Sequence, residues 1–385
     1  MALSFDTRYP SVDDLREKAK KRIPRFAFEY LDGGCNEDIN IRRNTSEIRD
    51  ISLKPTYIKD FKGASIKTTL FGEEYDVPFG VAPVGLQGLM WPNSPEILAK
   101  AANKHNVPFI LSTVTTMDIE RASELTEGKA WFQLFNPAED VVRNNILDRA
   151  EAAGCPVLVL LYDVPTFGYR PRDFKNGLAL PPKMTMANIF QVLGKPSWAL
   201  QTLKYGIPTF ETLRPYTPEG LNLRQLGKFM DKTFSGRLNE ELIKPIRDKW
   251  KGKLVLKGVA SEEDTEQAIK LGFDGIIVSN HGGRQLDAGE STIAPLTRIA
   301  EKYKDQITIM MDSGMRSGPD MARSLARGAE FIFMGCSFMY GAAAMGSKGG
   351  DHTMTILKVH LQQIMDQLCC ENIQDLHKHL IQPTN

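Results

Sequence analysis

The chain has 385 residues, 42% of them hydrophobic and 25% charged, a composition typical of a soluble globular protein with a sizeable core. Its 48 basic and 47 acidic residues nearly cancel, which gives no electrostatic reason to expect a nucleic-acid partner. The five cysteines are odd in number and match no metal-binding or redox spacing, so we expect a reduced, cytoplasmic protein without a metal site. No signal peptide and no run of eighteen apolar residues is visible.

Residues 1–76 are predicted to form an N-terminal helical cap. The stretch DDLREKAKKRIPRFAFEYLDGG indicates two short helices separated at Pro24, because proline cannot continue a helix from the preceding turn.

From residue 77 onward, short apolar runs alternate with amphipathic stretches such as 94–105, 137–154 and 261–272. Strands that alternate with helices imply parallel pairing and right-handed crossovers, and eight such units indicate a (β/α)8 TIM barrel. We therefore predict a single domain over residues 1–385, with the barrel in 77–385. The predicted strands are 77–83, 108–113, 130–135, 157–163, 253–259, 275–280, 307–314 and 331–335.

An insertion, residues 164–238, follows the fourth predicted strand and is far longer than an ordinary connection, which is typical of functional loops. Its segment 184–210 is apolar and aromatic with scattered lysines, a composition that can lie in a bilayer interface without spanning it. The same composition also allows a lid over the site.

Small or chemically useful residues stand at the end of every predicted strand. Active sites of barrel enzymes lie at this carboxyl-terminal face, so these residues predict the position of a site. They are Pro83-Val84-Gly85, Ser112, Gln133, Asp163, Lys257, Ser279 with His281, Asp312, and Gly335.

The stretch SNHGGRQLD, residues 279–287, carries the most specific chemistry. Two glycines let an imidazole extend into a cavity, and His281 has the intrinsic pKa of a general base, with Asp163 as its orienting partner. Arg284 and Arg170 are guanidinium forks suited to a substrate carboxylate.

Two further features are typical of a bound flavin nucleotide, one for its phosphate and one for its ring. MDSGMRSG (311–318) and GAEFIFMG (328–335) combine glycine-rich turns with Arg316 on the last two strands, as anion sites do. Lys257 ends an apolar strand, where it could stabilise a reduced flavin, form a Schiff base as in barrel aldolases, or pair with a neighbouring acid.

With SNHGGRQLD, the runs WFQL, DVPTFGYRPRD, LKGV and DSGMRSG occur in order, and the chain resembles the FMN-dependent L-2-hydroxy acid dehydrogenases and oxidases from about Tyr9 onward. That family includes glycolate oxidase, lactate dehydrogenase and mandelate dehydrogenase. The resemblance implies FMN as cofactor, oxidation of a small L-2-hydroxy acid to the 2-oxo acid, and a homotetramer.

The resemblance also implies roles for single residues. His281 corresponds to the base and Asp163 to its partner, while Tyr30, Arg170, Arg284 and the position of Phe135 correspond to substrate contacts. The implied cofactor contacts are Pro83, Val84, Gly85, Ser112, Gln133, Lys257, Ser279, Asp312, Ser313, Gly314, Arg316, Gly335 and Cys336.

Gly85 and Val114 are similar to the lactate and mandelate dehydrogenase branch, which implies a membrane quinone as electron acceptor. A peripheral position on the inner face of the cell membrane through residues 184–210 would follow.

Three residues depart from the family pattern. Phe135 replaces a tyrosine, Leu161 a threonine and Cys336 an arginine, which suggests an unusual substrate or weaker FMN retention. An oxidase that uses oxygen, a non-catalytic flavin-binding barrel and a lysine aldolase stay open as alternatives.

Overall fold

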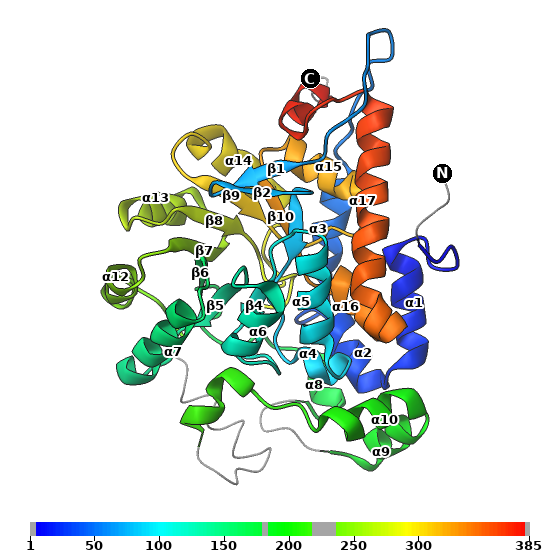
Figure 1. Cartoon of the computed structure of the whole chain (residues 1–385), viewed down its shortest axis with the longest axis vertical. Coiled ribbons are helices and arrows are strands. Elements are labelled where there is room, and N and C mark those ends of the chain that lie inside the picture. Colours follow the sequence, from blue (N-terminus) through cyan, green and yellow to red (C-terminus); the bar gives the residue numbers. More distant parts are fainter. Residues whose placement is uncertain (1–4, 179–183, 218–235, 382–385) are drawn as a thin grey trace.

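Eight parallel strands form the centre of the molecule in the computed structural model, which describes residues 5–178, 184–217 and 236–381 (Figure 1). A parallel bridge between Val81 and Phe109 joins the first strand of the sheet to the last, so the sheet closes on itself. This confirms the predicted (β/α)8 barrel. In sheet order the strands are β3 (Phe79–Val81), β10 (Phe331–Met334), β9 (Thr308–Met311), β8 (Gly275–Val278), β7 (Lys253–Val259), β6 (Val157–Leu161), β5 (Trp131–Phe135) and β4 (Ile110–Ser112).

The strands are apolar on both faces because each face meets a different core. Val159, Val255 and Phe333 pack inside the barrel, whereas Leu158 and Leu254 belong to the larger cluster beneath the surrounding helices. Strands buried on both faces appear as continuous apolar runs, which is why all eight could be predicted.

The helices that follow the strands lie around the barrel. The three stretches predicted at 94–105, 137–154 and 261–272 are observed as α5, α7 and α13 within a few residues. The bounds are α4 Gln87–Met90, α5 Ser94–Lys104, α6 Ile119–Thr126, α7 Asp140–Ala152, α12 Glu240–Lys249, α13 Glu262–Lys270, α14 Ile293–Tyr303, α15 Gly318–Ala326, α16 Cys336–Met345 and α17 Gly349–Leu368, with 3-10 turns η2 Gly346–Lys348 and η3 Ile373–His379.

The cap contains the two predicted helices, α1 (Val12–Arg22) and α2 (Arg25–Asp32), on either side of Pro24. It also contains two elements that the sequence pattern did not predict, helix α3 (Ile39–Arg49) and a hairpin of β1 (Thr68–Leu70) and β2 (Glu73–Tyr75). The Phe71 ring lies 5.8 Å from Trp131 and the Tyr75 ring 5.7 Å from Phe331. The hairpin therefore closes the amino-terminal end of the barrel.

The insertion contributes α8 (Pro171–Lys175), α9 (Met186–Leu193), α10 (Pro196–Tyr205) and η1 (Glu211–Tyr216); its residues 179–183 and 218–235 lie outside the described part. The Trp198 indole donates to Leu89 O at 3.2 Å, and Asn188 Nδ2 donates to Asn176 O at 2.9 Å. In Figure 1 the pair α9–α10 lies at the opposite end of the molecule from the β1–β2 hairpin. Within the described ranges, the structure has no helix with the length and apolar character needed to span a bilayer.

Candidate active site

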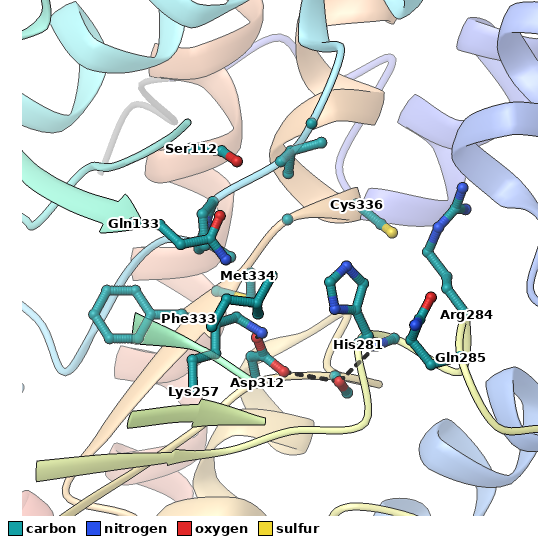
Figure 2. Close-up of a pocket in the computed structure, with 18 of the residues that line it drawn as sticks. Ser112, Gln133, Lys257, His281, Arg284, Gln285, Asp312, Phe333, Met334 and Cys336 are labelled. Atoms are coloured by element: carbon teal, nitrogen blue, oxygen red, sulfur yellow. Dashed lines mark hydrogen bonds and ion pairs between the residues drawn. The ribbon is translucent and has the colours of Figure 1, made fainter. Parts of the chain in front are cut away.

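A cavity that is open at its mouth lies at the carboxyl ends of the barrel strands. Figure 2 shows Gln133, Lys257, His281 and Cys336 around this space. The predicted residues in its lining are Tyr30, Pro83, Val84, Gly85, Ser112, Gln133, Phe135, Arg170, Lys257, His281, Arg284, Asp312, Ser313, Gly314, Arg316, Gly335 and Cys336.

His281 follows β8 in a left-handed backbone conformation, with φ 58°, and its N–H donates to Ser279 Oγ at 3.1 Å. Its ring Nδ1 lies 3.2 Å from Asp163 Oδ1. Asp163 lies behind the ring instead of lining the cavity. Burial alone would raise the pKa of Asp163, but the His281 ring and the Lys257 ammonium hold this pKa below the usual aspartate value. An ionised Asp163 can therefore orient the imidazole and stabilise its protonated form.

Gly258 makes room for this carboxylate. The pairing of β7 with β8 shifts register between Lys257 and Val259, and Gly258, in this irregularity, has φ +111°. A Cβ at Gly258 would lie 2.4 Å from Asp163 Cβ, well inside contact distance. Sequence reasoning missed this residue, although a glycine inside an apolar strand is a known sign of a bulge or a close approach.

Lys257 is only 3% exposed and pairs with Asp312, its Nζ lying 2.7 Å from Oδ2. The same Nζ donates to Ser279 Oγ at 2.9 Å. Ser279 therefore lies behind the cavity wall, where it holds both Lys257 and the backbone of His281. The ion pair predicted as one alternative is present, and an ammonium held this way is not the free amine that a Schiff base requires.

Two arginines, Arg170 and Arg284, line the cavity, and Arg284 contacts the cap. Burial and the nearby Arg284 guanidinium lower the pKa of Arg170 to about 10. Arg284 Nη1 donates to Tyr30 O at 2.7 Å and Gly33 O at 2.5 Å, so it interacts with the carbonyls at the end of α2. Two guanidinium groups that repel each other beside a cavity provide a site for an anion such as a carboxylate.

The cavity also presents groups that fit a phosphate. Helix α16 begins at Cys336 with no side-chain cap, so its first N–H groups and its dipole are available to an anion. Gly314, at φ +90°, and Arg316 line the same cavity. The residues present therefore suit FMN. Cys336 stands where the family has an arginine, so Arg316 would be the guanidinium that binds the phosphate.

The remaining wall is apolar. Phe135 and Leu161, two of the departures from the family pattern, line it with Val164 and Phe167. Gln285, in the SNHGGRQLD stretch, also lines the cavity, although no role was predicted for it.

The model of a family described as FMN-dependent dehydrogenase matches residues 19–383. An L-lactate dehydrogenase of Vibrio parahaemolyticus is 36% identical over 95% of this chain and 96% of that protein, and one of Caulobacter sp. is 36% identical over 97% and 99%. The crystal structure of a monotopic membrane protein, (S)-mandelate dehydrogenase, superposes with a TM-score of 0.92 at 31% identity, over 97% of this chain and all of that one.

Proposed function

The chain belongs to the FMN-dependent dehydrogenase family and is a 2-hydroxy acid oxidoreductase, and on this premise we propose that it oxidises an L-2-hydroxy acid with His281 as the base and a membrane quinone as electron acceptor. The observation that supports this most is the meeting of the His281–Asp163 pair with two guanidinium groups in one cavity.

Arg170 and Arg284 would bind the substrate carboxylate, which fixes the α-carbon within reach of the imidazole. His281 would then accept a proton from the substrate, and Asp163 would stabilise the imidazolium that forms. A bound FMN would supply the acceptor for the two electrons and for the second hydrogen that leave the substrate.

FMN would be bound by residues that line the cavity and by the amino terminus of α16. Lys257, fixed by Asp312, would lie beside the flavin ring, where a cation favours the anionic reduced form. Arg316 and the amino terminus of α16 would bind the phosphate.

The α9–α10 pair supports a peripheral membrane position and hence a quinone acceptor. Twelve of the nineteen large apolar side chains exposed in the described part of the chain lie between residues 164 and 217. The most exposed of them on this pair, Leu203, is 81% accessible and Phe190 is 67% accessible. Apolar side chains gathered in this way are typical of helices that lie in a bilayer interface.

An anaerobic titration of the FMN-reconstituted protein with a panel of L-2-hydroxy acids tests the reaction. Loss of the visible flavin bands with one acid supports the proposal, and retention of the bands with every acid contradicts it. Reoxidation by decylubiquinone faster than by dissolved oxygen would support the quinone, whereas the reverse order would favour an oxidase.

A further inference from the structure

Gln285 lies four residues after His281, and its side-chain amide joins the two loops that carry the site. Its Nε2 donates to Thr166 O at 2.9 Å and to Asp163 O at 3.4 Å. These bonds tie the loop that begins at Asp163 to the loop that carries His281.

The amide oxygen of Gln285 serves the same two loops from its other side. Oε1 accepts from the Gly168 N–H at 3.3 Å and from Arg170 Nη2 at 3.2 Å. Both ends of the amide are therefore used, so this partly buried side chain has partners for its donor and its acceptor.

The two loops touch closely at this point. A Cβ at Gly168 would lie 2.2 Å from Arg284 O, and Arg170 Nε donates to the same oxygen at 3.3 Å. The Arg170 guanidinium thus has two neutral acceptors, Gln285 Oε1 and Arg284 O, whereas its nearest carboxylate, Asp173 Oδ2, is 3.9 Å away.

Neutral acceptors have a specific consequence for an anion site. They orient the guanidinium without cancelling its charge, so the charge stays available to a ligand. A carboxylate at the same position would orient Arg170 equally well but would compete with a bound carboxylate.

We propose that Gln285 is a positioning residue, which aims the Arg170 guanidinium at the substrate carboxylate and fixes the Asp163 loop against the His281 loop. This inference rests on the proposed function, because it assigns Arg170 to that carboxylate.

The test compares three variants of the FMN-loaded protein. Gln285→Met keeps the shape and removes all four hydrogen bonds, and Gln285→Glu keeps an acceptor but adds a charge. Gln306→Met is the matched control, since Gln306 lies in the exposed turn after α14 and its side chain donates to Lys302 O.

We expect Gln285→Met to raise KM for the 2-hydroxy acid tenfold to hundredfold, the range for a lost hydrogen bond to a charged group. The Kd of oxalate, read from the flavin spectrum without turnover, should rise by the same factor. FMN affinity and the unfolding midpoint should match those of Gln306→Met.

Gln285→Glu gives a readout that a purely structural role would not change. The groups that face Arg170 are Arg284, Tyr30, Asp173 and Cys35, and a new carboxylate among them favours the cation. The rise of KM at alkaline pH should therefore begin at higher pH than in the wild type.

Unchanged KM and oxalate Kd in Gln285→Met would overturn the inference. The inference would also be overturned if KM and the oxalate Kd rose while FMN affinity and the unfolding midpoint fell to a similar extent, since Gln285 would then have only a structural role. A wild-type flavin that no 2-hydroxy acid reduces would instead contradict the proposed function.

Discussion

The cavity and the α9–α10 pair depart in opposite directions from the usual arrangement of polar and apolar residues. In the cavity, Lys257 and Asp312 are charged and buried, whereas on the helices Phe190 and Leu203 are apolar and exposed. Buried charge is costly unless it is paired or binds a ligand, and gathered apolar side chains at a surface indicate an interaction. A charged cavity at the carboxyl ends of the strands and exposed apolar side chains on α9 and α10 are what we expect of the proposed enzyme, which would work at a lipid surface.

The largest effect is expected at His281, whose removal tests whether the buried polar groups serve chemistry. His281→Ala should slow flavin reduction by the acid roughly 10²–10⁴-fold, the usual contribution of a general base. FMN affinity should hold, and His377→Ala, a change on the exposed face of η3, should leave both unchanged. Rapid mixing under anaerobic conditions measures the rate, and equal rates in both variants would remove His281 from the mechanism.

The next effect concerns the apolar helices. The double variant Phe190→Ser, Leu203→Ser should weaken partition onto phosphatidylglycerol-containing vesicles at least about hundredfold, because burying each of the two large apolar side chains contributes about 1.5–3 kcal/mol. Tyr57→Ser with Ile58→Ser is the matched control, since Tyr57 is about as exposed as Phe190, Ile58 is more exposed, and both lie outside the insertion. Sedimentation with vesicles reads the partition; equal losses in both pairs would show general stickiness instead of a membrane-binding face.

A smaller effect is expected where the cavity depends on backbone shape. Gly258→Ala places a methyl against Asp163 at φ +111°, which should lower the free energy of unfolding by about 1–3 kcal/mol and slow flavin reduction. Gly154→Ala has a similar positive φ of +78° with nothing within 4 Å, so it carries the conformational cost alone. Chemical denaturation and anaerobic rates separate the two costs, and identical behaviour of the variants would contradict the contact with Asp163.

The smallest effect is a pH dependence of substrate binding. Arg170 has its pKa lowered to about 10 from an ordinary 12.5, so its positive charge is lost as the pH rises through this value. KM should therefore rise above about pH 10, approaching tenfold per pH unit, while it stays level below. Steady-state kinetics across this range checks the result, and a level KM would show that Arg170 does not contact the carboxylate.

The barrel was predictable because each strand is a continuous apolar run that ends in a polar or small residue. His281 and Arg284 could be recognised for the same reason, since no core strand has use for an imidazole and a guanidinium at its end. The hairpin at 68–75 and helix α3 were not predicted. Their apolar residues are few, and contacts distant in the sequence, such as Phe71 with Trp131, hold them in place.

Other site residues depend on geometry that the sequence does not contain. Gly258 matters because of a register shift, and Gln285 because its amide meets Thr166 and Gly168, more than a hundred residues away along the chain. Such residues act through long-range hydrogen bonds and excluded volume. Only the folded backbone reveals these.

The most direct measurement mixes the FMN-loaded protein anaerobically with the L and D enantiomers of one 2-hydroxy acid, each with and without deuterium at the α-carbon. We expect the L enantiomer alone to bleach the flavin bands, more slowly when deuterated, and His281→Ala to abolish most of this reaction. Bleaching by both enantiomers at equal rates would contradict the assignment of this cavity to L-2-hydroxy acid oxidation. So would the absence of bleaching with either enantiomer, for every 2-hydroxy acid tried.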